Sequence, residues 1–257
     1  MKKKELKDFM DNKVEQYNHP KFLEEDPIQI PHTYSSKEDI EISAFLTATI
    51  AWGNRKSIIK NASRMMELMD NAPSEFIRMH QESDLQQLQP FVHRTFNAND
   101  FQTFVRGLKH IYQNYDGLEG IFRDHTVDDT LQPAISVLKK KFFEIPHQAR
   151  TTKHISDPLK GSSAKRLNMF LRWMVRQDQC GVDFGIWHSV KASSLSCPLD
   201  VHTGNVARHL GLIKRKQNDA KALAELDAQL RKWDPADPVK YDFALFGLGV
   251  FEGWGAP

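Results

Sequence analysis

Apolar residues along this chain recur at the three- and four-residue spacing of amphipathic helices. No stretch alternates apolar and polar residues over a convincing length, and no internal repeat is present. The pattern predicts an all-α fold with about ten helices of ordinary length. The clearest helical stretches are Leu6–Val14, Ile42–Leu46, Ile58–Met69, Phe101–Tyr112, Leu131–Phe142, Leu167–Met174, Val201–Leu210, Leu223–Leu230 and Phe243–Leu248.

Several helix boundaries carry their usual residues. Ser35 and Glu38 form the pattern of a capping box, which predicts a helix start at that point. Asp200 suits an N-cap before the helix that follows it, and Asn218 opens another helix. Gly211 is placed to end the helix that Asp200 begins.

Composition limits the class of protein. The 257 residues are 40% hydrophobic and 26% charged, enough for one large domain or two lobes with a sizeable core. No apolar run approaches a membrane span, and no apolar signal core follows the basic start, so we expect a cytoplasmic protein. The two cysteines cannot bind a four-thiolate cluster, and the histidines show no metal spacing, so we expect no metal and no cofactor.

Charge is balanced at +2 overall but is uneven along the chain. The segment 147–176 carries seven cations, against Asp157 as its one acid. These cations are Arg150, Lys153, Lys160, Lys165, Arg166, Arg172 and Arg176. They form either a surface that meets phosphate or an ordinary solvated face.

Two stretches stand out for their chemistry. In Lys160–Phe170, a short turn leads into a helix that carries Lys165 near its start. In Cys197–His202, a proline-led turn brings Asp200 to the start of another helix. A lysine and an aspartate at two facing helix starts can perform amine chemistry.

Both stretches resemble motifs of the helix-hairpin-helix DNA glycosylase superfamily. Its hairpin reads Leu-Pro-Gly-Val-Gly-x-Lys, and residues 159–165 keep the Leu, the first Gly and the Lys, with Ser163 in place of the second Gly. Its second motif resembles Pro-Leu-Asp-Val-His at 198–202, followed by Arg208 and Leu-Gly-Leu at 210–212. More closely, the chain resembles the DUF2400 group of bacterial proteins, through 165–174, 198–202 and 241–247.

The resemblance implies a two-lobed helical glycosylase-like fold with a helix-hairpin-helix motif and the site between the lobes. Residues 1–257 would form one such fold. Approximate lobes would be 36–145, which is helical, and 146–235, which holds the hairpin. Residues 1–35 and 236–257 would pack as terminal helices.

The implied activity is that of a DNA base-excision N-glycosylase with an additional AP lyase step, acting on an oxidised purine such as 8-oxoguanine. The implied partner is double-stranded DNA with a damaged base, bound by a monomer. Lys165 would attack the sugar C1′ as a free amine, because the neighbouring Arg166 and the positive helix end disfavour its ammonium form. Asp200 would stabilise positive charge on the sugar and take up the lysine proton.

The remaining site residues follow from the same resemblance. Contacts to DNA are expected from Lys160, Gly161, Ser162, Ser163, Arg166, Arg172 and Arg208. Aromatic side chains that would stack on a flipped base are Phe184, Trp187 and Trp52. Structural support is expected from His202 and Asn168.

Two other functions remain open. The chain would also suit a helix-hairpin-helix module that binds DNA without catalysis, in which Lys165 and Asp200 serve only as structure. A related glycosylase that acts on RNA or on an alkylated base is the third alternative. The joint presence of both residues in their motifs favours the enzyme.

Overall fold

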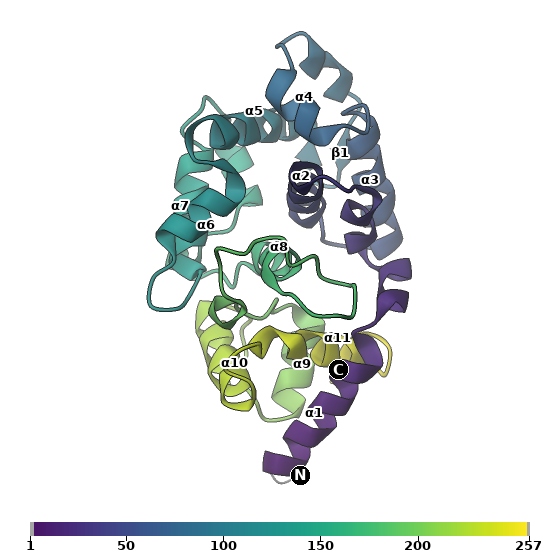
Figure 1. The fold of residues 1–257 in the computed structure, drawn as a ribbon, viewed down its shortest axis with the longest axis vertical. Helices are drawn as coiled ribbons and strands as arrows, with labels where there is room; N and C mark the ends of the chain where they lie inside the picture. Colours follow the sequence, from purple (N-terminus) through teal and green to yellow (C-terminus); the bar gives the residue numbers. More distant parts are fainter. Residues whose placement is uncertain (1–2, 256–257) are drawn as a thin grey trace. The chain divides into compact units, whose positions relative to one another are not determined.

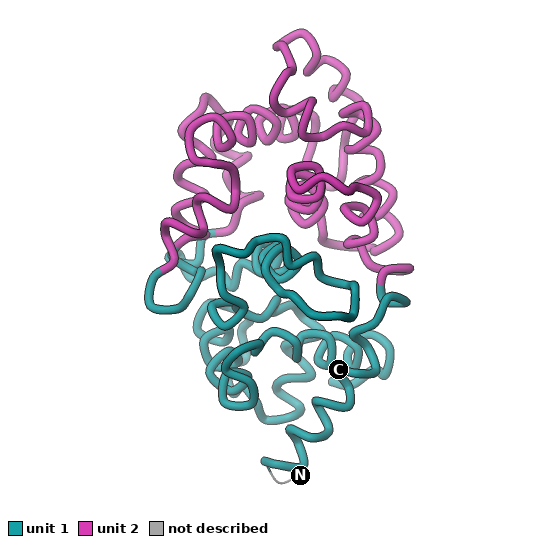
Figure 2. Tube along the Cα trace, in the orientation of Figure 1, with its two compact units in different colours: residues 1–22, 127–133, 157–257 teal, residues 23–126, 134–156 magenta. Residues whose placement is uncertain are grey.

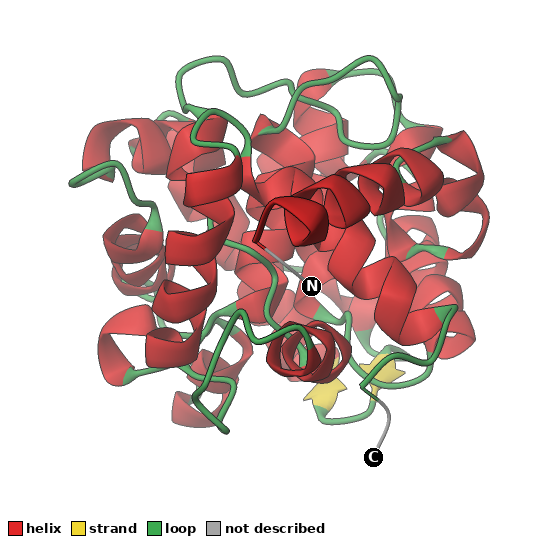
Figure 3. Ribbon diagram, turned by 90° about the horizontal axis from the view of Figure 1, so that it is seen from below, coloured by secondary structure: helices red, strands yellow, loops and turns green. Residues whose placement is uncertain are grey.

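The computed structural model describes residues 3–255, and helices dominate it (Figure 1). Eleven α-helices lie within these residues, with short 3₁₀ turns and one antiparallel pair of two-residue strands, β1 (Val92–His93) and β2 (Phe96–Asn97). Figure 3 shows the two strands in yellow among the red helices. The all-α class expected from the hydrophobic spacing is confirmed. The strands escaped prediction because two residues are too few to show an alternation.

The chain divides into two compact units (Figure 2). Unit 1 comprises Met1–Phe22, Val127–Pro133 and Asp157–Pro257. Unit 2 comprises Leu23–Thr126 and Ala134–Ser156. The chain therefore passes between the units more than once, and unit 1 includes both sequence motifs, 159–165 and 198–202.

Unit 1 is built on two helix pairs, in which α11 (Tyr241–Val250) packs against both α1 (Lys3–Tyr17) and α9 (Val201–His209). Its core contains side chains from these helices and from α10 (Ala220–Trp233), with Cys197 and Leu199 from the turn before α9. Gly247 allows the close approach of α1, because a Cβ atom there would lie 2.1 Å from the Tyr17 ring. The helices are α1 (Lys3–Tyr17), α8 (Lys165–Val175), α9 (Val201–His209), α10 (Ala220–Trp233) and α11 (Tyr241–Val250). Short 3₁₀ turns are η6 (Pro158–Lys160), η7 (Ala192–Ser194) and η8 (Pro238–Lys240).

Unit 2 has an aromatic core. The ring of Phe104 lies 5.2 Å from that of Phe96 and 4.9 Å from that of Phe142. Gly107 makes room for Phe142, since a Cβ atom there would lie 2.5 Å from that ring. The elements are α2 (Lys37–Thr49), α3 (Arg55–Glu67), α4 (Pro73–Met79), α5 (Ala98–Asn114), α6 (Gly117–His125) and most of α7 (Gln132–Phe142), with η2 (Pro27–Gln29), η3 (Pro31–Thr33), η4 (Asp84–Leu88) and η5 (Ala149–His154). The remaining turn, η1 (Pro20–Glu25), crosses the boundary between the units.

The start of α2 is capped by Ser36, whose hydroxyl accepts the Asp39 N–H at 3.2 Å, so the expected box at Ser35 and Glu38 is wrong by one residue. Consecutive serines and acids offer two registers, and the sequence alone does not choose between them.

No helix within residues 3–255 combines the length and the apolar character that crossing a bilayer requires.

Candidate functional site

The turn before α8 is held by its own backbone and by α10. The carboxylate of Asp157 accepts the Leu159 N–H at 3.1 Å, which starts η6. Gly161 follows with φ of +90°, a left-handed conformation that glycine adopts without strain. Its carbonyl accepts the Ala220 N–H at 3.0 Å, at the start of α10. The first helix of the expected hairpin is therefore only a 3₁₀ turn, and its tip is fixed to a third element.

The start of α8 is unusual. Ala164, the residue before the helix, lies at φ +44° and ψ +39° and is buried, although it is not a glycine. Asn168 compensates by donating from Nδ2 to the Ser163 carbonyl at 2.9 Å, while its Oδ1 accepts from Gln132 Nε2 at 2.9 Å. Asn168 thus connects the start of α8 to Gln132. No side chain caps α8, and an uncapped helix N-terminus is a typical site for an anion such as phosphate.

Lys165 is the first residue of α8 and is half-buried. Its Nζ points along the helix to Met169 Sδ at 3.7 Å, a weak contact that leaves the amine adaptable. The neighbouring Arg166 is largely withdrawn from solvent, and burial lowers the pKa of its guanidinium to about 10.

Asp200 caps α9 as expected. Its Oδ1 accepts the Thr203 N–H at 2.9 Å, and its carbonyl accepts Nδ2 of Asn218 at 2.7 Å. Asn218 is oriented by Arg208, whose Nη2 donates to its Oδ1 at 2.5 Å. Gly204 makes room for this contact, because a Cβ atom there would lie 2.5 Å from Asn218 Oδ1.

Arg208 was expected to contact DNA, and its guanidinium is instead used within the chain. Besides Asn218, it donates from Nε to the Arg215 carbonyl at 2.8 Å. Arg208 therefore supports the Asp200 turn, and its contact with DNA stays a prediction. The sequence placed Arg208 in the helix that Asp200 begins, but gave no sign that the loop after this helix folds back onto it.

Asp242 is the residue that the sequence motifs did not single out. It is the second residue of α11 and is 4% exposed. Its Oδ2 accepts from Arg172 Nη1 at 2.5 Å, and its Oδ1 faces the Cys197 thiol at 3.7 Å. Burial raises the pKa of Asp242 to about 6, the Asp200 charge adds to the rise, and the cations Arg172 and Lys165 oppose it. Asp242 thus lies within electrostatic reach of both expected catalytic residues.

Two arginines of the expected basic surface are buried instead. Arg172 is 3% exposed and bonds to Asp183 as well as to Asp242, and Arg176 is 2% exposed and bonds to Asp183, Asp178 and Asp237. The expectation that Arg172 contacts DNA is therefore wrong. The connector 177–197 supplies two of these acids, and the sequence could not show that it folds onto α8. A third cation of the run, Arg150, pairs with the buried Asp100 within unit 2.

The aromatic side chains separate into core and partly accessible groups. Trp187 is 1% exposed and packs edge-on against Phe170 with ring centres 5.4 Å apart, so it belongs to the core and not to a base pocket. Phe184 is half-buried in the connector, where its N–H donates to the Trp173 carbonyl at 2.8 Å. Trp52 belongs to unit 2, where its ring meets the His93 ring edge-on at 5.0 Å.

The other expected contacts vary in exposure. Lys160 and Gly161 are exposed, and a Cβ atom on Gly161 would meet no neighbour within 4 Å. Ser162 is half-buried and pairs with Asp219 as an isolated bridge, and Ser163 is 8% exposed. His202 is exposed in the first turn of α9, beside Gly249 of α11.

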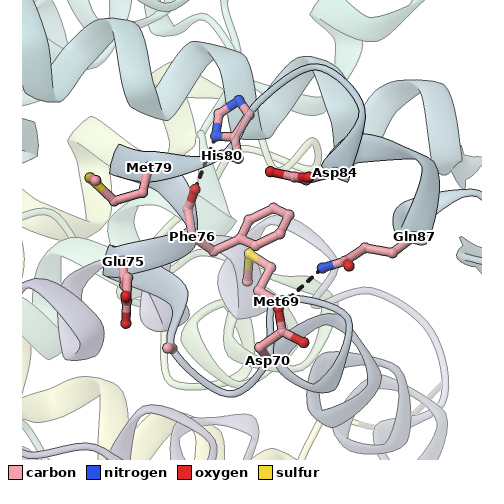
Figure 4. A pocket seen from close by; sticks show the side chains of 9 residues that line it. Met69, Asp70, Glu75, Phe76, Met79, His80, Asp84 and Gln87 are labelled. Atoms are coloured by element: carbon pink, nitrogen blue, oxygen red, sulfur yellow. Dashed lines mark hydrogen bonds between the residues drawn. The ribbon is translucent and has the colours of Figure 1, made fainter.

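Unit 2 has a hollow of its own at α4 (Figure 4). Its floor is apolar, with Met69 and Phe76, and its rim carries Asp70, Glu75 and Asp84.

The methionines on α3 and just after it lie in the core, as the sequence indicated. Among residues 3–255, no three His, Cys, Asp or Glu side chains are grouped as metal ligands would be.

Comparison with known proteins gives one match. A family model described as "Protein of unknown function (DUF2400)" matches residues 26–251, a span that includes the 157–164 turn, Lys165, Asp200 and Asp242. No curated protein and no solved structure matches the chain.

Proposed function

The chain belongs to the DUF2400 family, and from its site we propose that it is a DNA base-excision N-glycosylase with AP lyase activity. Its substrate would be double-stranded DNA that carries an oxidised purine such as 8-oxoguanine. The observation that carries the proposal is that Lys165 and Asp200 lie at the N-termini of two helices of one unit. The charges of both residues act on the buried carboxyl of Asp242.

Lys165 has the character that the chemistry requires. A nucleophilic amine needs partial burial and freedom from a fixed carboxylate partner. Lys165 is half-buried, and its Nζ is directed at a thioether, which accepts hydrogen bonds only weakly. The amine would attack the sugar C1′ of a flipped nucleotide, the base would leave, and the resulting imine would allow strand cleavage by β-elimination.

Asp200 suits the second role. A carboxylate stabilises a developing positive charge best when its orientation is fixed before the reaction. The Asp200 carboxylate accepts the Thr203 N–H, and the Asp200 backbone carbonyl accepts Nδ2 of Asn218. Asp200 would therefore stabilise the oxocarbenium character that the sugar acquires as the base departs.

The turn before α8 suits a phosphate. Gly161 is open to solvent, Lys160 is exposed beside it, and α8 begins without a capping side chain. The positive N-terminus of α8 and the Lys160 cation would fix the register of the DNA without reading its sequence.

Borohydride trapping tests the proposal. The full chain is incubated with duplexes that contain 8-oxoguanine, an abasic site or no lesion, in the presence of sodium borohydride. Wild type should form a covalent adduct with the lesion or abasic strand, and Lys165→Ala should form none. Lys232→Ala is the matched control, because it removes an equal charge from an exposed position in the last turn of α10, outside the candidate site, and should still form the adduct.

The outcomes separate the alternatives. The absence of an adduct from wild type on every strand would refute the lyase activity. Retained DNA binding in that case would favour a module that binds without catalysis. An adduct that persists in Lys165→Ala would show that another amine reacts.

A further inference from the structure

The hollow at α4 has no part in the proposed chemistry, yet it has the size and the lining of a ligand site (Figure 4). Its volume is about 380 Å³, which lies within the range of small-molecule sites in proteins. The nine residues that line it lie between Met69 and Gln87, so all of them belong to unit 2. One unit therefore forms the hollow on its own.

The floor of the hollow suits an apolar chain. Met69 and Phe76 are 0% and 8% exposed and form a fixed apolar surface. Met79, which also lines the hollow, is 69% exposed. Because a methionine side chain is unbranched and polarizable, Met79 can adapt to a chain that lies on this floor. A large apolar side chain exposed beside an apolar floor indicates a ligand with an apolar segment.

Three carboxylates lie around this floor without a cation. Asp70 accepts from Gln87 Nε2 at 3.4 Å, and Asp84 accepts the Gln81 N–H at 2.8 Å, so the donors to both acids are neutral. Within residues 3–255, no ion pair involves Asp70, Glu75 or Asp84. Their negative charge is therefore left for a ligand.

Two cations of α5 reach the segment 80–84, and both are held by other groups. Lys109 donates from Nζ to the His80 carbonyl at 2.8 Å. Arg106 forms an ion pair with Glu82 at 2.6 Å. Neither cation neutralises an acid of the hollow.

The neutral polar side chains of the hollow add acceptors. Nδ1 of His80 lies 3.0 Å from the Phe76 carbonyl and 3.1 Å from the Ile77 carbonyl, so Nδ1 carries the ring proton. Burial lowers the pKa of His80, so the ring is neutral at pH 7 and its Nε2 is an acceptor. Gln87 donates from Nε2 to the Leu68 carbonyl at 2.9 Å, which leaves its Oε1 as an acceptor. The hollow thus presents acceptors and negative charge to a ligand that donates.

The positions of the acids favour a ligand with several charges. In Figure 4, Glu75, Asp70 and Asp84 lie on three sides of the apolar pair Met69 and Phe76. A single ammonium group would meet one of these acids and leave the others unpaired. A chain with two or more ammonium groups would meet several of them while its methylene groups cover the floor.

We propose that the hollow at α4 binds a linear aliphatic polyamine, whose methylene segments lie on the apolar floor and whose ammonium groups pair with the acids of the rim. This binding goes beyond the proposed function and does not depend on it, because Lys165 and Asp200 belong to unit 1.

Methyl NMR of the full chain tests the proposal. The methionine methyl groups are labelled with ¹³C, and the Met79 resonance is identified by its loss in Met79→Leu. Spermidine, a linear triamine, is titrated at pH 7, and n-butylamine and magnesium chloride are titrated separately. Ionic strength is kept constant throughout, because salt screens exposed charges.

Spermidine should move the Met79 methyl resonance to saturation. Neither n-butylamine, which has an apolar chain with one charge, nor magnesium chloride, which supplies a cation without a chain, should reproduce this shift. The absence of a saturable shift with spermidine, or an equal response to either of the other two compounds, would overturn the proposal.

Two double variants identify the acids. Asp70→Asn/Glu75→Gln removes two rim charges and keeps the shapes of the side chains, and asparagine tolerates the left-handed backbone of Asp70 at φ +57°. It should weaken spermidine binding by roughly threefold to tenfold, since exposed ion pairs are individually weak. Glu15→Gln/Glu24→Gln is the matched control, because it removes an equal charge from exposed positions outside the hollow. Its affinity should equal that of wild type, and an equal loss in both double variants would overturn the proposal.

A basic peptide of a partner protein is the other occupant with this chemistry. The peptide acetyl-Lys-Leu-Lys-amide is titrated in the same way as spermidine. Weaker binding of the peptide than of spermidine is the expected result. Tighter binding of the peptide would assign the hollow to a protein partner and overturn the polyamine proposal.

Discussion

The buried carboxyl of Asp227 gives a stability prediction with a defined sign. Asp227 lies on α10 at 6% exposure, accepts the Cys197 N–H at 3.0 Å and lies 3.7 Å from Arg231. Burial raises its pKa from 3.8 to about 6. Because the folded pKa exceeds the unfolded value, this group stabilises the fold fully below about pH 4, and that contribution is lost as the pH rises through about 6.

The magnitude follows from the size of the shift. About two pKa units correspond to about 3 kcal/mol of folding free energy. In Asp227→Asn, the amide oxygen can still accept the Cys197 N–H, but the side chain no longer titrates. The difference in the free energy of unfolding, variant minus wild type, should therefore rise by about 3 kcal/mol between pH 4 and pH 7.

Urea unfolding at pH 4, 5.5 and 7, followed by circular dichroism, measures this difference. Glu225→Gln is the control on the same helix, with the opposite sign, because the Lys214 and Arg215 N–H groups lower the pKa of Glu225. Its stability relative to wild type should fall as the pH rises. Parallel pH profiles for wild type and Asp227→Asn would refute the reasoning.

Three further substitutions test local packing, each by urea unfolding at pH 7. Ala164→Val should lower the free energy of unfolding by about 2 kcal/mol or more, because a β-branched residue is strained at φ +44°. Ala164→Gly should not lower it, because glycine adopts this conformation without strain. Gly247→Ala should lower the free energy of unfolding by about 1–3 kcal/mol, because the new Cβ atom clashes with the Tyr17 ring. Tyr17→Ala removes that ring, so the double variant should be no less stable than Tyr17→Ala alone. Asn168→Ala should cost about 1–3 kcal/mol, since the Ser163 carbonyl loses its buried donor, and a cost near zero would contradict the role of Asn168 at the start of α8.

The fold class and the cap at Asp200 were readable from the sequence because both depend on local spacing. Helical periodicity survives in each segment, and an Asp before a helix binds an N–H three residues on, wherever the helix packs. Lys165 at the start of α8 was readable for the same reason.

Roles that depend on long-range contacts were not readable. Arg172 looked like a surface cation, since nothing in its own helix shows that Asp183 and Asp242 approach it from two other segments. Trp187 lies in a stretch of polar loop, and only the packing of that loop against α8 makes it core. The one local signal for Asp242 was its place in the Tyr-Asp-Phe stretch at 241–243, an acid between two aromatic residues at a helix start.

The most direct test of the central claim is to identify the amine that reacts with DNA. Wild type is trapped on an abasic-site duplex with borohydride and digested with protease and nuclease, and the modified peptide is sequenced by mass spectrometry. A reduced deoxyribose remnant on Lys165, within the peptide that spans the start of α8, is the predicted result. A remnant on any other amine, with Lys165 unmodified, would contradict the account.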